Sequence, residues 1–458
     1  MNKKTFKRLT VTLSLFVFFL TSACVSVESS SKTTVLEQPQ ERESIAETVA
    51  SEVIVEIAPE PPKENKKHIR GIHLSAWISG PSKHRTAAID LFDNTELNTA
   101  VIDIKELEGQ VYIDGVKTAD ANGTSFSRAI PNISQYLAQL KEKNIYTVAR
   151  IVVFRDNLMP RKKPSMGVKN PDGTLWTDKK GITWLDPYSK DAREYTFEIC
   201  ERAIELGFEE IQFDYIRFPS DGNIKNCRYK NNGTVYSSAE ASQAIVDFLK
   251  EANKRLKPKG AKISIDVFGL TTTSKDDMGI GQSIVEMTEW VDYVSPMVYP
   301  SHYYKGEYGI AEPNKEPYII VYKALEGALK RIPKEKLRPW LQDFSMGHPY
   351  GKNEVRAQIQ ATHDNDIGDW LLWNPRCVYT RGALEGNNAE TSYEKSNPPT
   401  PEMIKTAERL EAARIAQEKL ELESADAKIL EEVNNKKTAG SKQKKSEKKA
   451  KTTELEKE

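Results

Sequence analysis

Eight short segments rich in β-forming residues alternate with helical stretches through the middle of this 458-residue chain. Amphipathic stretches with helical periodicity lie between them, among them 131–143, 189–206, 238–256 and 352–364. Strands that alternate with helices predict a parallel sheet, and eight is the number of strands that closes a (β/α)8 barrel. The eight segments are 69–77, 99–106, 146–154, 210–219, 262–270, 291–300, 337–344 and 369–375.

An open, doubly wound sheet is the alternative arrangement of such elements. That fold normally carries a glycine-rich phosphate-binding turn after its first strand. Here the first segment leads into residues 77–81, WISGP, which contain no such turn. We therefore predict an α/β fold of the (β/α)8 TIM-barrel type over residues 67–395.

The N-terminus has the pattern of an export signal. Four basic residues precede an apolar stretch of 12 residues, 9–20, which is too short to span a bilayer comfortably. Ser22 and Ala23 stand before Cys24 as in a bacterial lipobox, although Thr21 occupies the position where that motif prefers Leu. We predict a lipoprotein signal peptide at 1–23 and a lipid on Cys24, which would anchor the exported protein at the cell membrane or surface. An ordinary cleaved signal peptide is the alternative.

Polar segments flank the predicted barrel. Residues 24–66 are rich in Ser, Thr, Glu, Lys and Pro and predict a disordered tether. Residues 401–433 have the composition of a surface helix, and the lysine-rich residues 434–458 predict a disordered tail. The whole chain balances 66 basic against 66 acidic residues, which argues against a nucleic-acid partner.

Three cysteines remain besides Cys24, and an exported protein can form disulfides. Cys227 and Cys377 both follow predicted strands, so a bridge between them is one alternative, and free thiols at these positions and at Cys200 are the other. The sequence has no CxxC spacing and no HxH pair at a strand end. We predict no metal site and no cofactor.

Side-chain alternation places acidic groups inside the barrel. In the fourth segment the apolar Ile211, Phe213 and Tyr215 should face the helices, so Asp214 points inward. The same parity points Asp266 of the fifth segment inward. Buried charges are costly unless they are paired or functional, and the strand ends of such barrels hold the active site.

The second and third segments add further charges to the same interior. Asp103 and Lys105 share one parity, and Arg150 shares that of Val148. Asp103 and Lys105 either pair with each other or belong to a site with Asp214. Together with Arg150, they are candidate substrate-binding residues.

Two carboxylates across a cleft are what glycosidic cleavage requires. Asp214 and Asp266 lie near the ends of adjacent strands, which run ~4.8 Å apart, so we assign Asp214 as nucleophile and Asp266 as general acid/base. Arg217, three residues after Asp214, would either keep that carboxyl ionised or form a purely structural salt bridge. The apolar sequence after Asp266 would raise its pKa.

Aromatic residues near the strand ends offer faces for stacking on sugar rings. Such residues can equally belong to the core, and this alternative applies to Trp77, Tyr299, Trp340 and Trp373 alike. Trp77 and Trp373 are the better candidates because each ends its strand. The remaining candidate substrate-binding residues are Arg217, Tyr299 and Gln342.

Residues 212–222 (QFDYIRFPSDG), together with 70–73 (RGIH) and 101–106 (VIDIKE), resemble a bacterial glycoside-hydrolase-like family. It is a domain of unknown function with an α-amylase-like barrel, and the resemblance covers about residues 69–395. It implies that Asp214 is the principal catalytic residue and that strand five or six supplies the acid. Strand five offers Asp266 where many relatives have Glu, and strand six has no carboxylate near its end.

Three functions compete on this sequence. The first is a retaining glycoside hydrolase acting on a cell-envelope or extracellular polysaccharide. The second is a non-catalytic carbohydrate-binding or envelope scaffold lipoprotein that keeps the same barrel. The third, a metal-dependent hydrolase, is disfavoured because His73 is isolated on the first segment. The expected partners are a polysaccharide or oligosaccharide and, through the lipid, a membrane.

Overall fold

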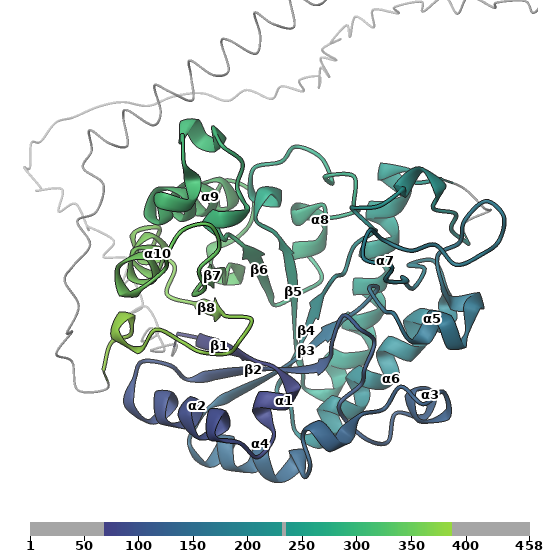
Figure 1. Cartoon of the computed structure of the whole chain (residues 1–458), viewed down its shortest axis with the longest axis horizontal. Helices are drawn as coiled ribbons and strands as arrows, with labels where there is room; N and C mark the ends of the chain where they lie inside the picture. The colour runs from purple at the N-terminus through teal and green to yellow at the C-terminus, as the bar shows by residue number, and fades with distance from the viewer. Residues whose placement is uncertain (1–67, 231–234, 387–458) are drawn as a thin grey trace, which may run out of the picture. The chain divides into compact units, whose positions relative to one another are not determined.

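The computed structural model describes residues 68–230 and 235–386. Eight parallel strands form a closed barrel in sequential order, which confirms the predicted fold (Figure 1). The predicted signal peptide, tether, C-terminal helix and tail lie outside the described residues. The strands are β1 (Arg70–Leu74), β2 (Thr99–Lys105), β3 (Tyr146–Val152), β4 (Glu210–Asp214), β5 (Lys262–Phe268), β6 (Tyr293–Met297), β7 (Trp340–Gln342) and β8 (Trp370–Trp373).

Helices surround the barrel, and most of them connect one strand to the next (Figure 1). None of those in the described ranges is long and apolar enough to cross a membrane. The connecting helices are α2 (Lys83–Asn94), α4 (Ile133–Glu142), α6 (Lys190–Leu206), α7 (Ser238–Leu256), α8 (Ile284–Thr288), α9 (Pro317–Leu329) and α10 (Lys352–Asp364). Shorter helices lie within the connections: α1 (Ala76–Ser79), α3 (Lys117–Ala121) and α5 (Met159–Lys162).

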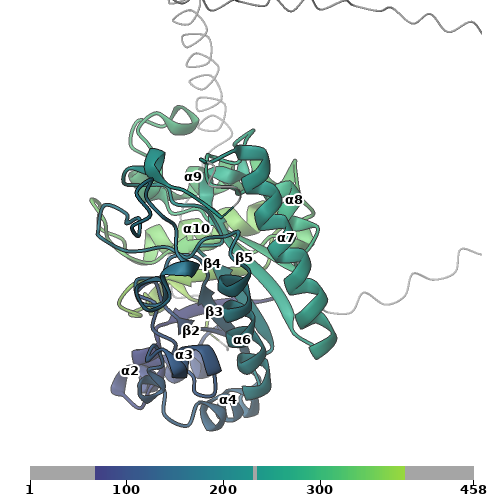
Figure 2. The same cartoon turned by 90° about the vertical axis from the view of Figure 1, so that its right-hand side faces the viewer.

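Local sequence signals explain where α6 begins and ends. The Ser189 hydroxyl accepts a hydrogen bond from the Ala192 backbone at the N-terminus. Gly207 ends the helix with a φ of 110°, a conformation that favours glycine. Figure 2 shows α6 and α7 lying over β4 and β5, whose outer faces they cover.

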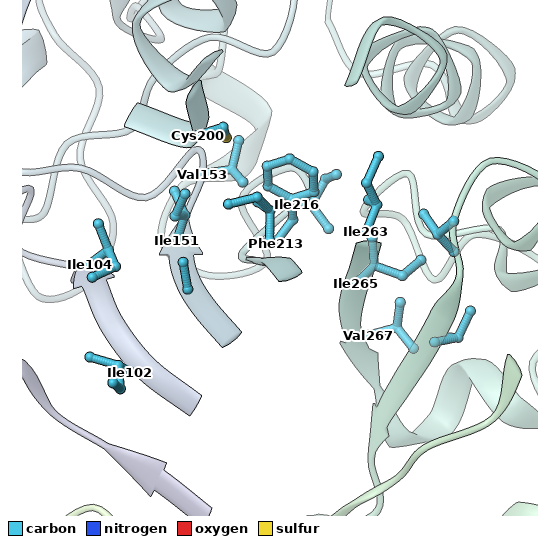
Figure 3. Packing of buried hydrophobic residues seen from close by; sticks show 14 of the residues in the cluster. Ile102, Ile104, Ile151, Val153, Cys200, Phe213, Ile216, Ile263, Ile265 and Val267 are labelled. Carbon is cyan, nitrogen blue, oxygen red and sulfur yellow. The ribbon is translucent and has the colours of Figure 1, made fainter. Parts of the chain in front are cut away.

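Buried apolar side chains form two layers, one on each side of the strands. The larger layer packs between strands and helices, and Figure 3 shows its members Ile102, Ile104, Ile151, Phe213 and Ile265. The smaller layer fills the barrel interior. It consists of Val101, Val148, Tyr299, Trp340 and Leu371.

This division follows the alternation of the strands. Because Val101 and Val148 lie inside, Asp103 and Arg150, two residues further on, are directed to the same side.

All eight strands end before the segments predicted for them, and the ends of β1 and β4 differ most in their consequences for the site. β1 ends at Leu74, and Trp77 lies in α1, whose N-terminus is capped by Ser75. β4 ends at Asp214 because Tyr215 has a φ of 49°, in the left-handed region. The prediction that Tyr215 faces the helices is therefore wrong, since the turn directs this side chain into a cavity.

The structure distinguishes between the two alternatives for the cysteines, a disulfide or free thiols. Cys200, Cys227 and Cys377 are all buried and free, so the Cys227–Cys377 bridge is not formed. Cys377 lies beside β1 instead, with its Sγ 3.8 Å from His73 Nδ1.

A buried ion pair lies at the opposite end of the barrel from the strand C-termini. Glu210, the first residue of β4, accepts hydrogen bonds from both terminal nitrogens of Arg338. Arg338 lies two residues before the start of β7. The Ser264 hydroxyl also donates to Glu210. Both charged side chains are fully buried, so each depends on the other for compensation.

Candidate active site

A cavity of about 730 Å³ opens at the C-terminal ends of the strands. Its position is the usual one for the active site of a (β/α)8 barrel. Eight of the predicted site residues line it: Trp77, Asp103, Arg150, Asp214, Arg217, Asp266, Tyr299 and Trp373.

Arg150 joins three acidic groups at the floor of this cavity. Its Nη1 donates to Asp103 Oδ1 at 2.5 Å, and its Nε donates to Asp214 Oδ2 at 3.1 Å. Nη2 also donates to Asp214, and Asp266 Oδ2 lies 3.8 Å from Nε. The three carboxyl groups therefore converge on one guanidinium, although they come from β2, β4 and β5.

Asp214 and Asp266 differ in their surroundings. Asp214 accepts hydrogen bonds from Arg150 and from the Tyr215 backbone at 2.6 Å, so cationic and polar donors hold it. Asp266 is 1% exposed and accepts a hydrogen bond from the indole Nε1 of Trp340 at 2.7 Å. Burial and the neighbouring charge of Asp214 raise the pKa of Asp266 well above its ordinary value.

His73, which the sequence indicated to be an isolated residue, belongs to the charged cluster around Arg150. Its Nε2 lies 2.7 Å from Asp103 Oδ2, and its ring stacks on Trp373 with 3.9 Å between the centres. Burial alone lowers the pKa of an imidazole, but the Asp103 carboxylate outweighs it and raises the pKa of His73 to about 9. Strand alternation in the sequence could have predicted this position. Ile72 and Leu74 pack against the helices, so His73 between them points inward.

The charges of this cluster balance only when Asp266 is protonated. Two cations, His73 and Arg150, contact two carboxylates, Asp103 and Asp214. Asp266 is a third acid in the same buried space, and its raised pKa is the electrostatic consequence.

The two tryptophans of the predicted sugar cleft have different environments. Trp77 is 55% exposed and touches Tyr112 edge-on. Trp373 is more enclosed, because it stacks on His73 and lies 4.8 Å from the Arg150 guanidinium carbon. Both tryptophans line the cavity, but Trp373 contacts the charged cluster and Trp77 does not.

Two predicted site residues do not reach the cavity. A bulge in β2 shifts the register so that Lys105 stands opposite Ile151, whose side chain packs toward the helices. Lys105 forms a buried ion pair with Asp156 at 2.9 Å, so the predicted alternative of a pair with Asp103 is wrong. Gln342 is fully buried in β7 and accepts hydrogen bonds from the backbone and hydroxyl of Ser301.

Arg217 lines the cavity but does not contact Asp214 as predicted. Because β4 has already ended, its guanidinium lies among aromatic rings, and Arg150 takes the place beside Asp214. No local pattern in the sequence could predict that Arg150, and not Arg217, pairs with Asp214, because Arg150 is 64 positions away from Asp214.

Glu106 is a further acidic residue of the cavity that the sequence analysis quoted only within a motif. It accepts a hydrogen bond from the Tyr112 hydroxyl at 3.1 Å. Burial, and after it the charge of Asp103, raise the pKa of Glu106. Within the two described ranges, no three His, Cys, Asp or Glu side chains are arranged to hold a metal ion.

Comparisons with known proteins agree with this geometry. Residues 71–379 match a family described as "Putative glycosyl hydrolase domain". A crystal structure of a hypothetical protein from Ruminiclostridium thermocellum is 35% identical, with 43% of this chain and 97% of that chain covered and a TM-score of 0.39. No curated protein matches this chain significantly.

Two further solved structures are less similar in sequence. The glycoside hydrolase domain of PgaB (BpsB) from Bordetella bronchiseptica is 14% identical, covering 69% of this chain and 99% of its own, with a TM-score of 0.53. The spore cortex-lytic enzyme SleL from Bacillus megaterium is 12% identical, covering 70% and 74%, with a TM-score of 0.42. At such identities the likeness to PgaB concerns the fold.

Proposed function

This chain belongs to the glycosyl hydrolase domain family that residues 71–379 match, and from that premise we propose that it is a retaining glycoside hydrolase. Its proposed substrate is a polysaccharide of the cell envelope or the extracellular space. Asp214 is the proposed nucleophile, and Asp266 is the proposed general acid/base.

One observation carries this assignment: two carboxyl groups of unlike environment share one guanidinium nitrogen. Asp214 accepts hydrogen bonds from Arg150 and from a backbone N–H. The raised pKa of Asp266 favours its protonated form, as a general acid requires. Paired acids whose surroundings separate their protonation states divide the roles of nucleophile and acid between them.

The distance between the two carboxyl groups favours retention. Asp214 Oδ2 lies 3.1 Å and Asp266 Oδ2 lies 3.8 Å from the same Nε of Arg150. The two oxygens are therefore no more than about 7 Å apart, which includes the ~5–5.5 Å of retaining enzymes and only the lower edge of the ~6.5–9.5 Å of inverting ones.

The proposed reaction has two displacements. Asp266 gives its proton to the glycosidic oxygen while Asp214 attacks the anomeric carbon, and the bond to the leaving sugar breaks. The ionised Asp266 then takes a proton from water, which attacks the same carbon and releases Asp214. The product keeps the anomeric configuration of the substrate, and both side chains return to their starting states.

The cavity and the N-terminal sequence support a polysaccharide substrate outside the cell. The volume of about 730 Å³ falls within the range of small-molecule sites, and the exposed Trp77 at its wall offers a stacking face. The predicted export signal and Cys24 would put this cavity in contact with envelope and extracellular glycans.

Release of reducing ends from a panel of envelope and extracellular polysaccharides tests the proposal. We expect at least one of them to be cleaved, and the first-formed anomer, followed by NMR, to have the configuration of the substrate. Asp214→Asn should abolish turnover. Asp266→Asn should slow the cleavage of natural glycans about 10²–10⁴-fold and recover in part on substrates with good leaving groups.

Glu106→Gln is the matched control, because Glu106 is another carboxyl of this cavity with a raised pKa. If Glu106→Gln, and not Asp266→Asn, shows the leaving-group dependence, the acid is Glu106. An inverted product would remove Asp214 from the nucleophile role. Binding of glycans without cleavage of any panel member would favour the non-catalytic carbohydrate-binding alternative.

A further inference from the structure

Arg217 is a buried cation in the cavity wall that lacks an acidic partner. Its side chain is 6% exposed, and it lines the cavity. Within residues 68–230 and 235–386 it forms no ion pair, whereas the other arginine of this wall, Arg150, pairs with Asp103 and Asp214. A charge at this depth is costly unless an opposite charge compensates it.

Three aromatic rings surround the guanidinium of Arg217. Its central carbon lies 4.6 Å from the ring centre of Phe268, 4.8 Å from that of Tyr215 and 5.1 Å from that of Trp184. Cation–π contacts of this kind offset part of the cost of burial. They do not satisfy the N–H groups at the edge of the guanidinium plane, which need hydrogen-bond acceptors.

One edge of that plane has no acceptor in the described part of the chain. Nη1 donates to the carbonyl of Phe218 at 3.0 Å and to the Ser220 hydroxyl at 3.2 Å. Nε and Nη2 make no hydrogen bond there, and neither nitrogen is sealed from solvent. Because the side chain lines the cavity, this edge is accessible to a bound substrate.

The same edge holds a carboxylate in two nearby arginines. Nε and Nη2 of Arg150 both donate to Asp214. Nε and Nη2 of Arg155 donate to Asp178 at 3.0 and 2.9 Å, and Arg155 shares the Tyr215 ring with Arg217. In both pairs the two N–H groups donate to a single carboxylate oxygen, Oδ2. The planar edge of a guanidinium can likewise hold the carboxylate of a ligand.

We infer that Arg217 binds a carboxylate of the substrate, so that the glycan cleaved in this cavity is acidic. The inference rests on the proposed function, because it places the sugar chain in the same cavity. The carboxylate belongs either to a uronic acid or to a lactyl ether on a sugar ring, and both present the same planar pair of oxygens.

The position of Arg217 places this carboxylate beside the reacting bond. Tyr215, which contacts Arg217, donates its backbone N–H to Asp214, and Phe268 lies two residues after Asp266. The acidic sugar is therefore bound next to the proposed catalytic pair. Asp214 and Asp221 act on Arg217 only at longer range than an ion pair.

Calorimetric binding to the full chain, compared between acidic glycans and their carboxyl-reduced forms, tests this inference. The probes are alginate, polygalacturonate and hyaluronan oligomers for uronic acids, and peptide-free peptidoglycan strands for lactyl ethers. Carboxyl reduction converts each carboxylate to an alcohol and leaves the linkages intact. We expect at least one acidic probe to bind about 30-fold or more tightly than its reduced form, as for a buried charge pair.

Variants assign the preference to Arg217. Arg217→Gln should remove the difference between acidic and reduced probes, and Arg217→Lys should keep part of it. Trp77→Ala, which changes the cavity wall without changing its charge, should weaken both forms equally. Melting curves check that each variant is folded, and the wild-type comparison decides the matter if Arg217→Gln does not fold.

Binding and turnover separate this inference from the proposed function. Equal affinity of the wild type for both forms, failure of every acidic probe to bind, or a preference that survives in Arg217→Gln overturns the carboxylate site. Tighter binding of a phosphodiester polymer than of any carboxylate probe also overturns it. If the acidic preference depends on Arg217 but no probe is cleaved, the carboxylate site stands and the hydrolase proposal fails.

Discussion

Asp214 and Asp266 show how environment separates two identical side chains. Both are almost fully buried at the end of neighbouring strands. Asp214 accepts hydrogen bonds from Arg150 and from a backbone N–H, whereas Asp266 is desolvated and faces the charge of Asp214, which raises its pKa. The two side chains are chemically identical, so the difference between them comes from the contacts that each one makes.

At this scale, Trp77 and Trp373 are expected to respond differently to truncation. Trp77→Ala should weaken glycan binding and change stability by less than about 1 kcal/mol, because Trp77 is 55% exposed. Trp373→Ala should also lower the free energy of unfolding by about 3 kcal/mol, because its ring packs on His73 and Arg150. Urea unfolding and calorimetric binding measure the two effects. Equal losses of stability in both variants would contradict this distinction.

The raised pKa of His73 predicts a stability that declines in alkaline solution. The folded-state pKa of about 9 lies above the ordinary value of 6.5, so the folded protein holds the proton more tightly than the unfolded chain. The stabilisation, about 3 kcal/mol at most, is complete below pH 6.5 and is lost as the pH rises through 9. Urea unfolding of the wild type and of His73→Gln over this range should show the decline only in the wild type.

The pKa of His363 is shifted in the opposite direction to that of His73. Burial and nearby arginines lower its pKa to about 4, so its contribution to stability is present above pH 6.5 and is lost as the pH falls toward 4. His363→Gln should therefore change the acid side of the profile and leave the decline above pH 6.5 intact. A decline on the alkaline side that persists in His73→Gln would show that another group causes it.

At the scale of elements, two backbone irregularities position the site. The bulge in β2 turns Lys105 away from Asp103, and the left-handed Tyr215 ends β4 directly after Asp214. Bulges and strained turns are common next to active sites, because they redirect side chains without unravelling the sheet. Here they separate a structural pair, Lys105 and Asp156, from the cluster around Arg150.

The Glu210–Arg338 pair should matter for stability and not for turnover. It lies at the strand N-termini, the end that stabilises such barrels and does not hold the active site. Arg338→Met should lower the free energy of unfolding by about 3–5 kcal/mol, because Glu210 keeps a buried and uncompensated charge. The double variant Glu210→Gln and Arg338→Met should lose less. Unchanged unfolding of Arg338→Met would contradict this role, and glycan binding by the folded variant is the control.

At the scale of the whole molecule, we propose separate roles for the barrel and the N-terminal sequence. The described residues contain the cavity and its charged cluster. The predicted export signal and Cys24 concern where that cavity meets its glycan.

Lipid attachment at Cys24 is the prediction that belongs to this scale. Intact-mass analysis of protein extracted from membranes should give a chain that begins at Cys24 and carries lipid, because basic, apolar and small residues precede it in the order of a lipoprotein signal. Cys24→Ser should move the protein to the soluble fraction without changing its melting temperature. A mature chain that begins elsewhere, or an unmodified Cys24, would contradict the prediction.

The sequence by itself determined the barrel and the inward direction of its acids. Both follow from local periodicities, of two residues in strands and 3.6 in helices, which are written in neighbouring residues. Predicted helices at 189–206 and 352–364 correspond to α6 and α10 within one residue at each end. Asp103, Asp214 and Asp266 line the cavity as their parity required.

Only the tertiary structure decided which charges meet. Arg150, and neither Lys105 nor Arg217, pairs with Asp103 and Asp214, and these partners lie 47 and 64 positions away along the chain. Such contacts depend on the register between strands, on a bulge in β2 and on the residue where β4 ends. A change of one residue in any of these redirects a side chain to the other face of the sheet, so local patterns cannot determine the pairing.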